Sequence, residues 1–221
     1  MAHEFVFDMK PKARDALVRP EAAVDLARSL VSEVARTWKR ESAYPYYSGV
    51  QTYSRKLLGE KWVARISIHE LPWDWFKAGI CDDHTENELE YIDQFETYTE
   101  IDAGESGWKG IVAKYALSFP LSVRELPEWV LAVQPDPEIR EFFVISVPAK
   151  CPISKGAVLG RYTSVEQVRE LRDGRIEWTM AFTSDGGGTI PRWIQNLVLP
   201  STTAKDVPSF IEWAKRKYAI E

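Results

Sequence analysis

Residues 176–183 read IEWTMAFT, and large apolar side chains alternate there with smaller or polar ones. A period of two is typical of a β-strand that buries one face. The apolar face of this strand consists of Ile176, Trp178, Met180 and Phe182. A few positions later, residues 190–218 space their apolar side chains by three and four, which predicts a terminal helix. Because elements adjacent in sequence are usually adjacent in space, we expect the helix to cover the apolar face of the strand.

The N-terminal part of the chain predicts a second helix and a hairpin. Apolar residues recur at helical spacing over residues 20–39, directly after the start signal Pro20. Two strand patterns follow at 50–58 and 62–70, around a turn at Gly59. The apolar face of the second pattern consists of Trp62, Ala64, Ile66 and Ile68. Side chains of this size must be covered by another element.

The remaining patterns predict one antiparallel sheet. Two short helices interrupt it within residues 71–95. Further strands are expected at 97–101, 108–119, 129–134, 142–148 and 158–168. In the terminal helix, Pro200 and Pro208 are expected to cause a kink or a restart, with Asp206 as an N-cap. The order of elements predicts an α+β fold, in which a curved antiparallel sheet carries a long C-terminal helix, in a single domain over residues 1–221.

The pattern leaves open what lies between the sheet and the terminal helix. The inward side chains could pack directly on the helix as a solid core, or enclose a ligand together with it, and periodicity does not distinguish the two. The residues that we expect on this face are Ile66, Ile68, Tyr115, Leu117, Phe119, Trp178, Met180, Phe182, Trp193 and Leu197. The last five of these residues belong to the 176–183 strand and to the terminal helix, which we expect to face each other.

Seven short segments carry a resemblance to a known family. They are residues 62–69, 83–92, 161–168, 177–181, 184–188, 190–194 and 205–213. The four segments between 161 and 194 are similar to the C-terminal half of a START-like lipid-binding domain. The other three resemble, more narrowly, the START-like domain of unknown function common in fungi. The resemblance spans about residues 60–215 in the right order and departs from the family at SVREL, 122–126, where an Arg-Asp-Phe-like step is typical and Arg124 is the counterpart.

The resemblance implies a helix-grip fold, in which an antiparallel sheet curls around the C-terminal helix and leaves an apolar tunnel between them. It therefore favours a cavity over a solid core. The function it implies is binding of a lipid or other apolar small molecule, for transfer, sequestration or presentation. Because related folds also host enzymes, the alternative is a cofactor-free cyclase or pericyclase acting on a polyketide-like intermediate in natural-product biosynthesis.

Catalytic signatures are absent from the sequence, so no catalytic residue is assigned and no cofactor is expected. The sequence has no GxSxG, GxGxxG or P-loop pattern, and His69-Glu70 lacks the second histidine of a zincin. An enzyme would have to rely on shape and a few hydrogen bonds. Candidate polar contacts, if they point inward, are Arg65, His69, Arg124, Tyr162 and Glu177. The alternative for each is a solvated or salt-bridged outer face of the sheet.

Two further motifs have a simple structural explanation. His84 and Glu88 could share a helical face with an aspartate at 82 or 83, but a solvated acidic face explains them equally well, and no metal site is expected. Residues 185–189, DGGGT, could point backbone N–H groups at an anion, although a flexible turn into the helix needs the same glycines. Together with Pro200, this turn is the expected hinge for ligand entry.

Charge and composition exclude several partners and compartments. The net charge is −5, and the longest basic run is Lys215–Lys217, so no nucleic-acid partner is expected. Cys81 and Cys151 form no disulfide or zinc pattern, which indicates a reducing compartment. Residues 1–10 lack the apolar region of a signal peptide, and no apolar run is long enough to span a membrane. We therefore expect a cytoplasmic protein that makes at most transient contact with membranes, with its oligomeric state left open.

Overall fold

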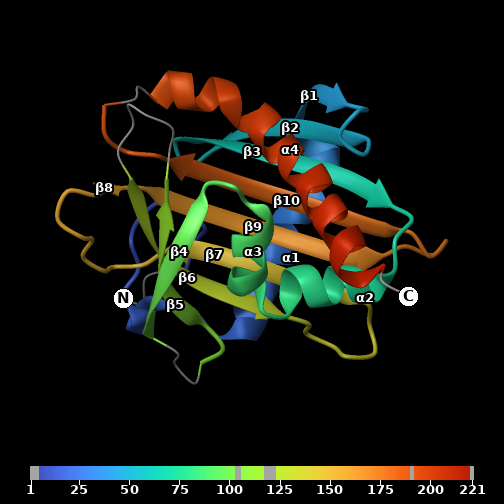
Figure 1. Cartoon of the computed structure of the whole chain (residues 1–221), viewed down its shortest axis with the longest axis horizontal. Coiled ribbons are helices and arrows are strands. Elements are labelled where there is room, and N and C mark those ends of the chain that lie inside the picture. Colours follow the sequence, from blue (N-terminus) through green and yellow to red (C-terminus); the bar gives the residue numbers. More distant parts are fainter. Residues whose placement is uncertain (1–4, 103–105, 117–122, 190–191, 220–221) are drawn as a thin grey trace.

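A single curved sheet positions every other element of the chain (Figure 1). The computed structural model describes residues 5–102, 106–116, 123–189 and 192–219, the last range without the side chains of 192–198. The sheet has ten strands in the order β1-β2-β3-β10-β9-β7-β6-β5-β4, and β8 pairs with β6 off this path. The strands are β1 (Lys39–Tyr44), β2 (Val50–Leu57), β3 (Glu60–His69), β4 (Phe95–Asp102), β5 (Lys109–Tyr115), β6 (Arg124–Val133), β7 (Glu141–Pro148), β8 (Val158–Leu159), β9 (Arg161–Glu170) and β10 (Ile176–Asp185).

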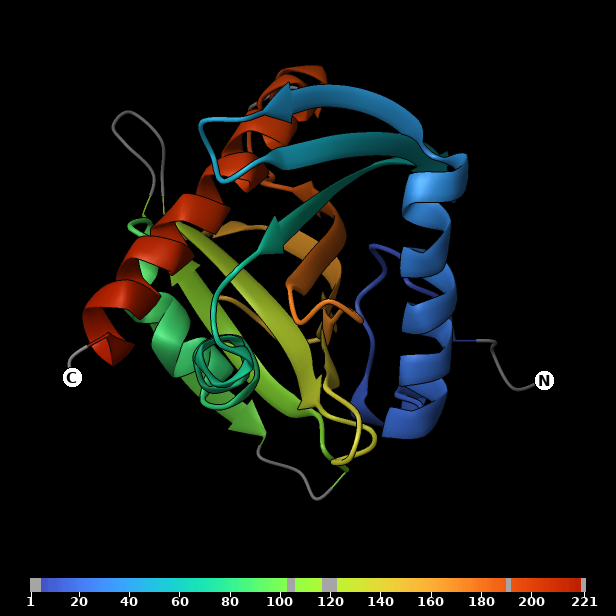
Figure 2. The same ribbon diagram turned by 90° about the vertical axis from the view of Figure 1, so that its right-hand side faces the viewer.

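Helices cover both faces of this sheet. Helix α1 (Pro20–Thr37) lies against the outer face, and α4 (Arg192–Tyr218) crosses the inner face, so that the sheet separates them (Figure 2). The short helices α2 (Trp73–Phe76), η2 (Lys77–Cys81) and α3 (His84–Tyr91) lie beside α4. This is the helix-grip arrangement of an α+β fold, as the sequence predicts.

Burial on both faces explains why the central strands are apolar at consecutive positions. In β7 every residue after Glu141 is buried. Phe143 and Ile145 pack with Ala27 and Val31 of α1 on the outer face, whereas the alternate residues of β7 face the inner side. A strand between two layers loses the simple polar and apolar alternation that marks a half-exposed strand.

Turn geometry fixes the register of the β2–β3 hairpin. The two turn residues, Leu58 and Gly59, both have positive φ, of 50° and 85°. A two-residue hairpin turn needs this conformation at both positions, and glycine adopts it without steric cost. The predicted turn at Gly59 is therefore confirmed, and the hairpin pairs Leu57 with Glu60.

Helix α4 differs from the prediction in one respect. It continues through Pro200 and Pro208 as one helix, so Asp206 lies within it and is not an N-cap. Each proline removes one backbone hydrogen bond. Burial of the apolar side of the helix, which includes Val207 and Phe210 at no measurable exposure, stabilises it in spite of this loss.

Candidate ligand-binding cavity

A cavity of about 680 Å³ lies between the inner face of the sheet and the helices α3 and α4. On the sheet side its walls come mainly from β5, β6, β9 and β10, and Arg65 of β3 and Ser146 of β7 complete them. The volume is in the usual range for small-molecule sites. At about 30 Å³ for each water-sized group, it has room for roughly 20 non-hydrogen atoms. A larger hollow of about 930 Å³ beside Arg14 and Asp15 is lined mostly by residues of the exposed N-terminal segment, so it is a surface depression.

The inner face of β10 forms one wall of the cavity. Trp178, Met180 and Phe182 line it. The register pairs Met180 with Arg65 of β3 on one side and with Glu166 of β9 on the other. Directly paired residues project to the same face, so these three side chains stand in a row across three strands.

On β3 the cavity face is the one that the sequence assigns to the outside. Ile66 and Ile68 pair with Thr179 and Glu177, so they project away from the cavity and do not line it. Ile66 packs on the outer cluster with Trp38, and Ile68 is 42% exposed. The expectation that these two isoleucines face the cavity is therefore corrected. Helix α1 packs on the outer face of the sheet and needs an apolar surface there, and both isoleucines lie on that outer face.

The other apolar residues expected at the site have different outcomes. Tyr115 lines the cavity, where its ring stacks on Phe95 with the ring centroids 4.9 Å apart. Leu117 and Phe119 lie outside the described residues. The side chains of Trp193 and Leu197 also lie outside them, so the expected contact of these residues with β10 stays a prediction.

Of the candidate polar contacts, Arg65, Arg124 and Tyr162 line the cavity. His69 shares the inner face of β3 but does not line the cavity; its Nε2 lies 2.8 Å from Ser67 Oγ, and burial lowers its pKa to about 4. Glu177 points to the outer side, where its carboxylate lies 2.7 Å from Arg169 Nη2. Of the two positions that the sequence allows for Glu177, the cavity or a salt-bridged outer face of the sheet, the structure shows the outer face.

Arg65 is the buried cation of the central row. The residue is 1% exposed, and its guanidinium carbon lies 3.9 Å from the centroid of the Trp178 ring. Its Nη2 is 3.9 Å from Glu166 Oε2, which accepts a hydrogen bond of 2.7 Å from Trp178 Nε1. Among the described residues, no hydrogen-bond partner reaches Nε or Nη1 of Arg65.

Four carboxyl groups that the sequence did not predict as ligand contacts also line the cavity: Glu88, Glu128, Glu166 and Asp206. Burial raises the pKa of Asp206 to about 7 and raises the pKa of Glu88 and Glu128 as well, because desolvation disfavours the charged form. At neutral pH the cavity therefore offers carboxyl groups that can donate as well as accept hydrogen bonds. A single acid on an otherwise apolar face, such as Glu128 between Leu126 and Val130, is the signal that could have revealed them.

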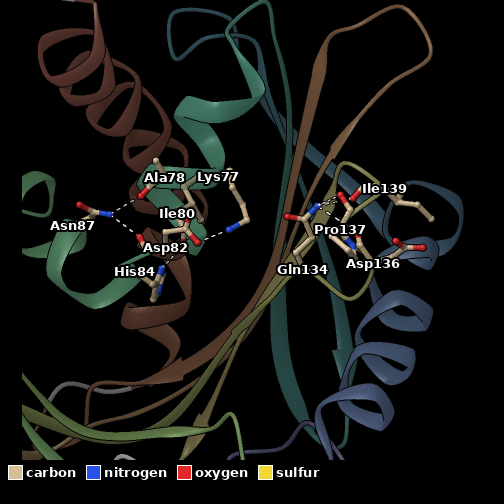
Figure 3. Close-up of polar contacts among 10 residues, drawn as sticks. All are labelled: Lys77, Ala78, Ile80, Asp82, His84, Asn87, Gln134, Asp136, Pro137 and Ile139. Carbon is tan, nitrogen blue, oxygen red and sulfur yellow. Dashed lines mark hydrogen bonds and ion pairs between the residues drawn. The ribbon is translucent and has the colours of Figure 1, made fainter.

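Local hydrogen bonds hold α3 at the cavity wall (Figure 3). Nδ1 of His84 donates to the Ile80 carbonyl at 2.8 Å, and Nδ2 of Asn87 donates to the carbonyls of Ala78 and Asp82, both at 2.9 Å. The Nε2 atom of His84 is 3.5 Å from Glu88 Oε2, one turn further along the helix. These bonds fix the helix to η2 and present Glu88 to the cavity. Within the described part of the chain, no group of three or more histidine, cysteine, aspartate or glutamate side chains could hold a metal ion.

The glycine-rich segment after β10 contributes Gly186 to the wall of the cavity. Gly187 has a φ of 62°, and a Cβ atom built on it would lie 2.2 Å from the Leu159 carbonyl oxygen. Only glycine fits such a close approach. The Gly187 N–H donates to Asp185 Oδ1 at 3.0 Å, so this group is used within the turn itself.

Comparison with known proteins identifies relatives of the chain. A family model described as a protein of unknown function, DUF3074, matches residues 62–214. A search of curated proteins finds no match. Similar solved structures include human StAR-related lipid transfer protein 5, with 12% identity, a TM-score of 0.72, and coverage of 90% of this chain and 99% of that one. Human STARD10 has 15% identity, a TM-score of 0.69 and coverage of 88% and 83%.

A bacterial structure shows the same similarity. A STAR-related lipid transfer protein fragment from Xanthomonas axonopodis has 15% identity and a TM-score of 0.65, with coverage of 80% of this chain and 98% of that one. At these identities the solved structures establish the fold alone. The helices in the described part of the chain include none with the length and apolar character needed to cross a membrane.

Proposed function

We propose, from the premise that this chain belongs to the DUF3074 family and has a START-like fold, that it binds one lipid or other apolar small molecule in its internal cavity. The observation that carries the proposal is the 680 Å³ space between the sheet and α4, which side chains do not fill. Natural cores are close-packed, with few voids larger than a water molecule. A void of this size in a single domain is typical of a small-molecule binding site.

Size and lining narrow the class of ligand. Room for roughly 20 non-hydrogen atoms suits a single acyl chain or a compact polycyclic skeleton, and excludes a two-chain phospholipid held entirely inside. At about 0.3 kcal/mol for each ligand atom, such a molecule binds with a Kd in the micromolar to tens-of-micromolar range. The names of the solved neighbours, which are lipid transfer proteins, support lipids as the first class to test.

The proposed role is that of a carrier that transfers, sequesters or presents its ligand in the cytoplasm. Binding requires no cofactor, because the driving force is the removal of apolar surface from water. Exchange with a membrane would need transient contact at the mouth of the cavity. The turn at residues 185–189, which follows β10, and Pro200, which lies within α4, are the proposed hinge.

Titration with a fluorescent fatty acid tests the proposal. We expect saturable binding of one probe molecule per chain, with a Kd of about 1–50 µM and an increase in fluorescence as the probe leaves water. An unlabelled fatty acid should displace the probe competitively. Linear, non-saturable uptake, or binding that unlabelled lipids do not displace, would contradict the proposal.

The buried carboxyl groups favour one second candidate, a cofactor-free cyclase or pericyclase acting on a polyketide-like intermediate. Asp206, with its pKa raised to about 7, faces the same cavity as the cation Arg65. A carboxyl group with a pKa near neutrality is suited to general acid–base catalysis, and a nearby cation to stabilising an enolate.

The two candidates are distinguished by turnover. An enzyme should convert a poly-β-ketone substrate with a rate that changes around pH 7, and replacement of Asp206 by asparagine should lower kcat by about 100-fold or more. A carrier should release every ligand chemically unchanged. Mass spectrometry of ligands recovered after incubation measures the difference.

A further inference from the structure

The guanidinium of Arg65 is incompletely satisfied by the protein. Its side chain is buried, yet its Nε and Nη1 have no hydrogen-bond partner among the described residues. Nearly all buried polar groups in folded proteins have a partner, because an unmet donor costs its full desolvation. Arg65 lines the cavity, so its guanidinium lies beside any molecule held there, and a small shift of the buried Nε and Nη1 toward this space would give them an acceptor.

Neighbouring side chains hold this cation in place without completing its hydrogen bonds. The Trp178 ring lies 3.9 Å from the guanidinium carbon and covers it by a cation–π contact. Glu166 Oε2 is also 3.9 Å away, beyond hydrogen-bond distance from Nη2, because it accepts the Trp178 indole N–H instead. The guanidinium is therefore preorganised, with donors left for a ligand.

The charges around the cavity restrict what this ligand group is. Glu166 already provides one carboxylate beside Arg65. Asp206, Glu88 and Glu128 line the same space: where they are ionised they repel an additional anion, and where they are protonated they can donate further hydrogen bonds to an oxygen of the ligand. An uncharged oxygen acceptor receives a strong hydrogen bond from the guanidinium and adds no repulsion.

We propose that the ligand carries an uncharged carbonyl oxygen, of the ketone, aldehyde or ester class, that accepts a hydrogen bond from the Arg65 guanidinium while its apolar remainder lies along Met180 and Phe182. This inference rests on the proposed function and assigns Arg65 as a specificity-determining residue. A cavity of this kind would select ligands by their carbonyl group as well as by their apolar surface area.

A matched ligand series tests the inference. Tridecan-2-one, dodecanoate, dodecylammonium and tridecane have nearly the same chain and differ at one end, and each competes with the fluorescent fatty acid. We expect the ketone to bind most tightly, about 10- to 100-fold more tightly than the alkane, which is the range for a hydrogen bond to a charged group. In Arg65→Met the ketone should lose this advantage, while the alkane binds as before.

Two controls keep the outcome clear. Arg169→Met removes an arginine from the outer side of the sheet and should leave the ligand order unchanged. If Arg65→Met does not fold, Arg65→Lys serves in its place, because it keeps the charge and changes the donor geometry.

Each result supports or overturns the inference. Equal affinity for ketone and alkane, or a ketone preference that persists in Arg65→Met, overturns it. Tightest binding of dodecanoate also overturns it and indicates an anionic headgroup, with Arg124 and Arg161 at the other end of the cavity as a second source of positive charge. If no chain binds the wild type at all, the proposed function itself fails.

Discussion

Replacing Asp206 with asparagine is expected to stabilise the protein at pH 8 by about 2–4 kcal/mol. Burial raises the pKa of this carboxyl group from 3.8 to about 7. Each pKa unit corresponds to about 1.4 kcal/mol of difference between folded and unfolded states. The expected gain in stability is smaller than the value obtained by converting the whole pKa shift into free energy, because solvent in the cavity screens part of the effect.

The sign follows from proton binding. With its folded-state pKa above its unfolded value, Asp206 stabilises the fold fully below about pH 4, and this contribution is lost as the pH rises to about 7. Asparagine has no such loss. The advantage of Asp206→Asn should therefore grow from pH 4 to pH 7 and level off above it.

Thermal unfolding across this pH range measures the effect. A gain of 2–4 kcal/mol corresponds to a rise in Tm of about 4–16 °C for a chain of this size. The matched control is Glu212→Gln, on the exposed side of the same helix, which should change Tm little at any pH. A lower Tm for Asp206→Asn at pH 8 would contradict this expectation, because it would show that the attraction between Arg65 and ionised Asp206 outweighs both desolvation and the repulsion from Glu166 and Glu88.

A destabilising acid at this position is consistent with a functional site. Residues that serve binding or catalysis are often retained at a cost in stability. Asp206 lies on a helix whose neighbouring residues Val207 and Phe210 are completely buried, so an apolar side chain would fit the local pattern better.

Replacing Met180 with tryptophan is expected to abolish ligand binding, with at least a 100-fold loss of affinity for an apolar ligand. Met180 lines the middle of the cavity, between Arg65 and Glu166. An indole at this position occupies space that the ligand needs. In a solid core the added atoms would cost about 1–3 kcal/mol of stability, but a cavity of 680 Å³ accommodates them with a smaller loss.

Parallel measurement of Tm and of affinity separates these effects. Ile68→Trp adds the same side chain to the outer face of the neighbouring strand, where Ile68 is 42% exposed, and should leave affinity unchanged. A large fall in Tm for Met180→Trp, together with no ligand uptake by the wild type, would support a solid core. The protein would then act through its surface, as a module that binds other proteins, and would not be a carrier.

The elements with the strongest periodicity were predictable from sequence. Strand β10 and helix α4 show clear patterns because each has one uniformly apolar side that must be buried. Strand β1 was missed because it is polar and no residue in it is buried, which leaves no alternation to detect.

The orientation of β3 was not predictable from its own pattern. Its apolar set, which includes Ile66, faces outward to the side covered by α1, and its inner side holds Val63, Arg65, Ser67 and His69, of which Arg65 lines the cavity. The pattern alone suggests that the more apolar side faces the terminal helix. This assumption fails for β3 because α1 covers the other face of the sheet and also needs an apolar surface there.

The buried carboxyl groups escaped prediction for the same reason. Glu128 and Glu166 lie in strands with both faces buried, so neither shows a polar face of its own. Asp206 resembles a helix N-cap in sequence because Pro208 follows it. Only the three-dimensional arrangement shows that these acids meet Arg65 around one space.

A crystal structure of the protein with a bromine-labelled ligand, 13-bromotridecan-2-one, would show whether the cavity binds an apolar molecule. The anomalous signal of bromine locates one end of the ligand independently of the protein density. We expect one bromine site per chain inside the cavity between β10 and α4, with the ketone oxygen about 2.7–3.2 Å from an Arg65 nitrogen. A cavity that contains only water, with bromine on the protein surface or absent, would contradict this expectation.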